Sequence, residues 1–96
     1  SMSRSIKRRI ENALYDVDPN SRDVRNALVC TGITVEPTDD WLVMDEIYDE
    51  IEDEVLRIKY LFYAWHNGKR YFVTLLYDFL DGCRWSAVVT RDSVWR

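Results

Sequence analysis

The sequence is poor in the residues from which simple functional motifs are built. Its 96 residues include three glycines, two prolines, two cysteines and one histidine. Gly68 and Gly82 both fall in expected hairpin turns, so no glycine-rich loop remains that could cradle a phosphate. Cys30 and Cys83 are too few for a disulfide framework, and their spacing matches no zinc pattern. We expect two reduced, packed thiols in a cytosolic protein.

Long apolar runs are missing as well. No run approaches the ~20 residues of a membrane span, and the N-terminus lacks the apolar core of a signal peptide. Ser1, which precedes Met2, is interpreted as a remnant of expression cloning. With 47% apolar residues and thirteen aromatics, the composition is that of a globular chain. These observations predict one domain, residues 1–96, in the cytoplasm of the producing cell or of an infected host.

Catalytic motifs are absent too. The sequence contains no nucleophile elbow, P-loop, dinucleotide fingerprint or His-Glu-x-x-His. His66 is the single histidine and lies beside an expected turn, where a histidine is usually just exposed and polar. A nucleophilic role for Cys30 or Cys83 would need a base that the fold brings close. We therefore expect neither an enzyme nor a cofactor.

Two turn signals between residues 55 and 91 predict a three-stranded antiparallel meander. Asn67-Gly68 suits a type I′ turn, which needs φ > 0 at both central residues. It sets apolar residues opposite each other on one face: Ala64 and Tyr71, Phe62 and Val73, Tyr60 and Leu75, Ile58 and Tyr77. A three-residue loop, Leu80-Asp81-Gly82, extends this face with three more pairs: Tyr77 and Trp85, Leu75 and Ala87, Val73 and Val89. A two-residue loop would set Asp78 opposite Trp85, so the apolar pattern favours the longer loop.

The reverse face of this meander is more apolar than a solvated face needs. The predicted register places Asp78 between Arg57 and Arg84, an opposite-charge row that favours pairing. The apolar residues of the same face are Leu61, Tyr63, Phe72, Leu76 and Val88. The candidate residues for association with a partner or a second subunit are Tyr63, Trp65 and Phe72. The favoured expectation is that three helices cover both sides of the sheet, which would leave no open face.

Helices are expected in the first half of the chain. In residues 4–32 a helical pair is predicted, the first helix over Ser5–Val17 with an apolar stripe of Ile6, Ile10, Leu14 (or Ala13) and Val17. Ser21 can cap the second helix, which runs to about Cys30 with Gly32 as its stop. Ile33–Glu36 is expected as a short edge strand, and 38–54 as an acidic third helix. The predicted fold is α+β, in the order α-α-(β)-α-β-β-β.

The boundary between the third helix and the first strand of the meander stays open. The 3–4 spacing of apolar residues continues through Met44, Tyr48, Ile51, Val55, Ile58, Phe62 and Trp65. A single helix from Asp40 to His66 would therefore also fit. The β-branched and aromatic content of Ile58–Trp65 favours a strand instead.

The net charge of −4 conceals a strong segregation. Residues 1–25 carry six basic and four acidic residues, and residues 55–96 carry seven basic and three acidic. Between them, residues 36–54 carry ten acidic residues and no basic one. On a helix, the like-charge pairs of this segment at i,i+4 would each cost ~0.2–0.5 kcal/mol. Such a cost is easily avoided, so it suggests either a function or a face that serves solubility.

The acidic face is the candidate surface for a basic, nucleic-acid-binding partner. Carboxylates at helical spacing can mimic phosphates and steer association. The residues predicted to bind the partner are Asp45, Glu46, Asp49, Glu50, Glu52 and Asp53. A helix fans its carboxylates outward, whereas a hard cation needs ligands that converge, so no metal site is expected.

A smaller basic patch lies near the N-terminus and consists of Arg4, Lys7, Arg8 and Arg9. Such a patch can contact phosphates. A winged-helix arrangement would however insert the acidic third helix into the DNA groove, where phosphates repel it. Direct nucleic-acid binding is therefore disfavoured, and the patch is interpreted as a solvated face or as a complement to an acidic neighbour.

In size, acidity and lack of catalytic residues, the chain resembles small acidic single-domain inhibitors, such as phage anti-defence (anti-CRISPR) proteins and toxin immunity proteins. The resemblance includes no shared motif, so it assigns no residue a role. The leading hypothesis is a non-enzymatic inhibitor that binds a basic partner. The alternatives are a homodimeric structural or adaptor protein that associates through the aromatic sheet face, and a weak nucleic-acid binder that uses the basic helix.

Overall fold

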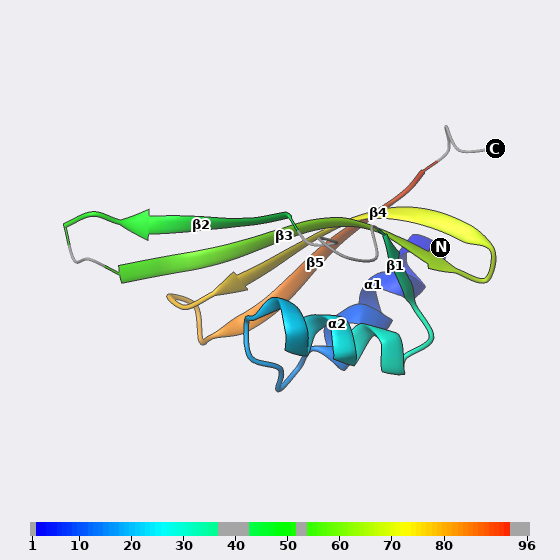
Figure 1. Cartoon of the computed structure of the whole chain (residues 1–96), viewed down its shortest axis with the longest axis horizontal. Helices are drawn as coiled ribbons and strands as arrows, with labels where there is room; N and C mark the ends of the chain where they lie inside the picture. The colour runs from blue at the N-terminus through cyan, green and yellow to red at the C-terminus, as the bar shows by residue number, and fades with distance from the viewer. Residues whose placement is uncertain (1, 37–42, 52–53, 93–96) are drawn as a thin grey trace.

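The fold is α+β, with two helices on one face of a five-stranded antiparallel sheet (Figure 1). A computed structural model describes residues 2–36, 43–51 and 54–92, and for residues 2–4 and 43–49 the backbone alone. The helices are α1 (Met2–Ala13) and α2 (Ser21–Cys30). The strands are β1 (Thr34–Glu36), β2 (Val43–Asp49), β3 (Glu54–His66), β4 (Lys69–Asp78) and β5 (Arg84–Arg91).

Strands β3, β4 and β5 form the predicted meander in the predicted register. The pairs include Ala64 with Tyr71 and Ile58 with Tyr77 across the first turn, and Tyr77 with Trp85 across the second. Asn67 and Gly68 have φ of +53° and +73°, as a type I′ turn requires. The second loop is longer than predicted, because β4 ends at Asp78 and β5 begins at Arg84. Gly82 has the expected positive φ of +72°, and Cys83 shares this conformation at +51°.

The predicted acidic helix over 38–54 is wrong where the structure describes it. Residues Val43–Asp49 form strand β2, which pairs with β3 from Val43 opposite Leu61 to Asp49 opposite Glu54. The alternative of one helix from residue 40 to 66 is wrong for the same reason. The apolar residues of this segment are spaced as in a helix. However, β3 has a second edge, and the amides and carbonyls along that edge need hydrogen-bond partners. Strand pairing with that edge is therefore favoured over a helix, which like charges at i,i+4 would destabilise.

The two N-terminal helices follow the predicted pattern with small shifts at their ends. In α1 the stripe of Ile6, Ile10 and Leu14 is buried, although the helix ends at Ala13 instead of Val17. In α2 the N-cap is Asn20 instead of Ser21, and its side-chain oxygen accepts a hydrogen bond from the Asp23 N–H at 2.9 Å. Gly32, with φ of +82°, allows the chain to turn after α2 into β1.

The hydrophobic core lies between the helices and one face of the sheet. The residues that form it are Ile6, Ile10, Leu14, Val24, Leu28, Ile33, Val35, Ile58, Tyr60, Phe62, Ala64, Tyr71, Val73, Leu75, Trp85 and Ala87. Alternate residues of β3 supply Ile58, Tyr60, Phe62 and Ala64, as the period of a strand requires. Burying each large apolar side chain contributes about 1.5–3 kcal/mol. The same alternation leaves the remaining residues of β3 on the face without helices.

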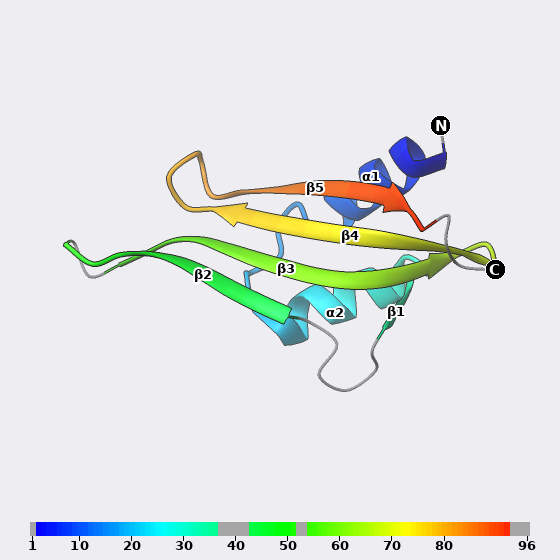
Figure 2. The same cartoon turned by 90° about the horizontal axis from the view of Figure 1, so that it is seen from above.

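The outer edge of the sheet at β5 is protected by α1, which lies beside it (Figure 2). Glu11 of α1 accepts a hydrogen bond from the Ala87 N–H at 2.9 Å and pairs with Lys7 at 2.7 Å. The indole N–H of Trp85 donates to the Val17 carbonyl at 2.9 Å. Glu11 therefore occupies a backbone N–H of β5 that would otherwise be open to another strand, and the Trp85–Val17 hydrogen bond holds the segment after α1 against β5.

Replacing Glu11 with alanine is expected to lower the free energy of unfolding by about 1.5–3 kcal/mol, the usual contribution of a hydrogen bond to a charged group. Urea denaturation would measure it, with Asn12→Ala as the matched control because Asn12 is exposed on the same helix. Equal losses in the two variants would contradict a specific role of Glu11 at the sheet edge.

Candidate functional site

A two-stranded arm projects from one end of the molecule (Figures 1 and 2). Strand β4 ends where Asp78 pairs with Arg57, but the pairing of β2 with β3 continues to Asp49 opposite Glu54. The arm is therefore the part of the β2–β3 hairpin that extends beyond Arg57. It contributes to the elongated shape, whose principal extents are 46 × 22 × 22 Å.

The acidic residues gather on and beside this arm instead of on a helix. Asp45, Glu46 and Asp49 belong to β2, and Glu50 is exposed in the turn that follows. Glu52 and Asp53, which were also predicted to bind the partner, lie outside the described residues. From Asp49 to Glu54 the sequence has five acidic residues and no basic one.

Two features of the arm are not explained by stability: one is unfavourable to the isolated chain, and the other contributes nothing to its core. Asp49 and Glu54 are directly opposite in the ladder, and like charges in such a pair are destabilising. Ile51, in the turn, is 92% exposed. Sequence reasoning assigned Ile51 to the apolar stripe of a helix and therefore missed it as a surface residue. The sequence did contain a signal for a surface position, because Ile51 stands alone among five acidic residues.

The second candidate surface is the sheet face opposite the helices, here called the open face. Both helices lie on the other side (Figure 1), so the expectation that helices cover both sides is wrong for the described residues. Residues Val43–Asp49 form a strand and not the third helix that was expected to cover this face. Phe72 is 38% exposed and Val88 66% exposed on the open face.

The three predicted association residues, Tyr63, Trp65 and Phe72, lie close together on the open face. The rings of Tyr63 and Phe72 are 5.2 Å apart, and the Arg70 guanidinium lies 3.8 Å from the Tyr63 ring centroid. Trp65 donates its indole N–H to Glu36 of β1. Arg70 pairs with Glu36 at 3.3 Å and with Asp92 at 3.1 Å. Sequence reasoning missed Glu36 and Asp92, because neither belongs to the meander pairs.

The opposite-charge row predicted for this face is present in the ladder. Asp78 has Arg57 on one side and Arg84 on the other, and it forms an ion pair with Arg57 at 3.1 Å. The Asp78 carboxylate also accepts hydrogen bonds from the Leu80 and Asp81 N–H groups. Partial burial raises the pKa of Asp78, but these hydrogen bonds and the Arg57 charge outweigh it and lower the pKa below the ordinary 3.8.

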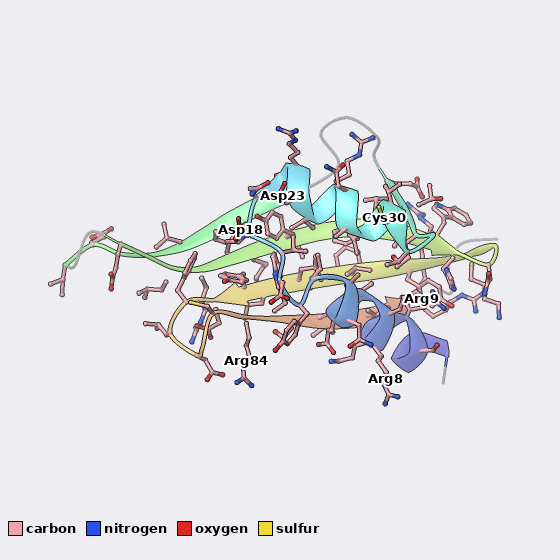
Figure 3. The ribbon with its side chains drawn as sticks, turned by 90° about the horizontal axis from the view of Figure 1, so that it is seen from below. Arg8, Arg9, Asp18, Asp23, Cys30 and Arg84 are labelled. Atoms are coloured by element: carbon pink, nitrogen blue, oxygen red, sulfur yellow. The ribbon has the colours of Figure 1, made fainter. Side chains whose placement is uncertain are left out.

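The described residues of the predicted basic patch lie on α1. Lys7 pairs with Glu11, while Arg8 and Arg9 are exposed and extend from α1 on the helix side of the molecule (Figure 3). The side chain of Arg4 lies outside the described residues. The patch is therefore on the other side of the molecule from the open face.

The cysteines differ from the expectation of packed thiols. Cys30 and Cys83 are both free and exposed, Cys30 at the end of α2 and Cys83 in the loop between β4 and β5. Burial raises the pKa of the Tyr77 hydroxyl, and the neighbouring Cys83 adds to this shift. Cys83 also borders a cleft of about 600 Å³ whose lining is completed by Glu11, Asn12, Tyr15, Asp16, Gly82, Arg84 and Trp85.

Searches for other kinds of site were negative over the described ranges. In residues 2–36, 43–51 and 54–92, no group of three histidine, cysteine or acidic side chains is placed to share a metal ion. None of the helices in this part of the chain is long and apolar enough to cross a membrane. Comparison with protein-family models, curated proteins and solved structures finds no match to the chain.

Replacing Asp78 with asparagine tests the charge row through its pH dependence. A lowered pKa in the folded state means that ionised Asp78 stabilises the fold above the unfolded pKa, and that this contribution is lost as the pH falls through the folded pKa. The difference in unfolding free energy between wild type and Asp78→Asn should therefore be largest near neutral pH and shrink as the pH falls below the ordinary pKa of 3.8. Denaturant titrations at both pH values would measure it. A difference independent of pH would contradict the electrostatic origin.

Proposed function

We propose that the chain is a non-enzymatic protein-binding module that uses its acidic arm to engage a basic, nucleic-acid-binding partner and inhibit it. The observation that carries the proposal is the arm itself, which projects beyond the sheet while its Asp49–Glu54 segment carries five acidic and no basic residues. A concentrated charge at the end of an elongated molecule steers an oppositely charged partner toward that end.

The cost of the arm to the free chain supports a binding role. The like-charge pair of Asp49 and Glu54 is unfavourable until cations lie nearby. A basic groove supplies such cations, and it turns the repulsion into attraction on binding. Ile51, exposed among these carboxylates, offers an apolar contact at the centre of the same surface.

The competing physical explanation is that the acids protect the sheet from aggregation. Strand β2 is paired with β3 on one side, and charges on such an edge discourage pairing with another chain. That role requires charges within β2, such as Asp45, Glu46 and Asp49. Four further acids lie between residues 50 and 54, outside β2, so protection of the β2 edge does not account for them. Their position favours binding.

A second candidate is a homodimeric adaptor, which the open face with its aromatic residues favours. The two candidates use different surfaces. The arm would bind a basic partner, whereas the open face would bind an apolar one.

Reversing three charges of the arm, with Asp49→Lys, Glu50→Lys and Asp53→Lys, is expected to abolish partner binding without unfolding the chain. The fold should be retained because Asp49→Lys replaces a like-charge pair with an opposite-charge pair. Pull-downs from a lysate of the native host, read by mass spectrometry, should recover a basic protein with wild type and lose it with the variant.

The matched control is the triple variant Asp16→Lys, Asp18→Lys and Asp81→Lys. These three acids are exposed and lie outside the arm, Asp16 and Asp18 between α1 and α2 and Asp81 in the β4–β5 loop, and their reversal changes the net charge by the same amount. The control should retain the partner. Equal recovery with all three proteins would overturn the proposal, and loss with both variants would show that net charge matters instead of the arm.

A further inference from the structure

The two edges of the sheet differ in how the fold protects them. At the β5 edge, α1 lies alongside and Glu11 occupies the Ala87 N–H at 2.9 Å. The opposite edge is formed by β1 and β2, which both pair with β3. Over the described ranges β2 pairs with β3 alone, and it runs along the margin of the sheet (Figure 2). An unpaired strand edge of this kind is a template for a strand from another chain.

The backbone groups of successive strand residues face opposite edges, so the pairing fixes which residues of β2 face outward. The Arg70 carbonyl in β4 accepts a hydrogen bond at 3.0 Å from the Asp92 N–H, which follows β5. Arg70 therefore faces β5, and the preceding Lys69 faces β3. Because Lys69 is opposite His66 across the type I′ turn, the backbone groups of His66 face β4.

The same alternation along β3 turns its odd-numbered residues toward β2. Val43, Asp45 and Ile47 of β2 are opposite such residues, so these three direct their backbone groups to β3. The register shift between the two strands comes after Ile47 and does not disturb this order. Met44 and Glu46, which lie between them, therefore direct their N–H and C=O groups away from β3. These are the groups that an added strand would bind.

The charge of β2 decides which kind of strand can be added. Val43–Asp49 includes three acidic residues and no basic one, and the exposed Glu50 follows directly. A second copy of β2 would bring the same acids alongside, and like charges in neighbouring strands are destabilising. A strand that carries lysine or arginine would instead form opposite-charge pairs. The acids therefore exclude the chain's own β2 and select a basic strand.

We propose that the basic partner adds an extended segment, rich in lysine or arginine, to the outer edge of β2 as a further strand of the sheet. Strand addition rests on the proposed function, because β2 leads into the acidic arm that attracts this partner. Hydrogen bonds to the backbone of Met44 and Glu46 supply affinity, and the acids of β2 supply the preference for basic residues. Basic segments of nucleic-acid-binding proteins are commonly disordered when free, so they can adopt an extended conformation on binding.

A peptide of defined sequence tests strand addition. The probe is the end-capped heptapeptide Lys-Val-Lys-Val-Lys-Val-Lys, which matches the seven residues of β2 and alternates charge with a strand-forming residue. At saturation it should slow the amide hydrogen exchange of Met44 and Glu46 about tenfold or more, measured by NMR on the isotope-labelled chain. The amides of Val43 and Asp45, which already face β3, should change far less.

The matched control is the same peptide with every backbone amide N-methylated, which keeps all its charges and donates no main-chain hydrogen bond. It should bind about fivefold or more weakly and leave the exchange of Met44 and Glu46 unchanged. Equal binding of the two peptides, or binding without the alternating protection, would overturn strand addition. Attraction of a basic partner by charge alone would then still stand. Failure of the unmodified peptide to bind at millimolar concentration would also overturn strand addition, whereas the pull-downs test the proposed function separately.

A proline at Met44 tests the edge from the side of the protein. Met44→Pro removes one outward N–H without changing the charge, and an edge strand tolerates proline where the N–H faces outward. Affinity for the unmodified peptide should fall about two- to tenfold, as expected for one backbone hydrogen bond. Met44→Ala keeps the N–H and should bind as wild type does, with circular dichroism showing that both variants are folded. Equal affinity of the two variants would overturn the assignment of this edge.

Discussion

The alternation of side chains along β3 is the constraint on which the rest of the structure depends. This strand pairs with β1, β2 and β4, and every second residue from Ile58 to Ala64 is buried against the helices. A shift of one residue would exchange the two faces and expose Tyr60 and Phe62 to water. The Asn67-Gly68 turn prevents this shift, because its geometry fixes which residues of β4 lie opposite. The register of β3 with β4 therefore decides which face receives the helices and which face stays open.

The acidic arm is a consequence of unequal strand lengths. Strand β3 has thirteen residues and β4 ten, so β3 extends past β4 at one end, where β2 alone accompanies it. Val55 of this hairpin still packs against the core, whereas Glu50, Ile51 and Glu54 are exposed and available for recognition. The elongated shape and the acidic residues at one end thus share one cause, and the proposed interaction with a basic partner makes use of it.

Local rules were sufficient for the meander and for the helical pair. Turn residues and apolar alternation predicted the pairs of β3, β4 and β5, including the position of Asp78 between Arg57 and Arg84. The apolar stripe predicted α1, and its residues are buried. The predicted site was only partly correct. The association residues Tyr63, Trp65 and Phe72 do lie together, but the partner-binding acids were expected on a helix and several of them belong to β2. Glu11 and Glu36 were missed, because their partners are distant in the sequence.

The sequence by itself determined the elements whose information is local: two amphipathic helices, two turns with positive φ, and three strands whose apolar faces match in one register. Only the tertiary structure decided the state of residues 43–49 and the coverage of the sheet. Their apolar spacing fits a helix and a strand equally well, so the choice depended on hydrogen-bonding groups along the second edge of β3, which no local pattern reveals. Because that segment is a strand, no helix of the described residues covers the second face, and Phe72 and Val88 are exposed there.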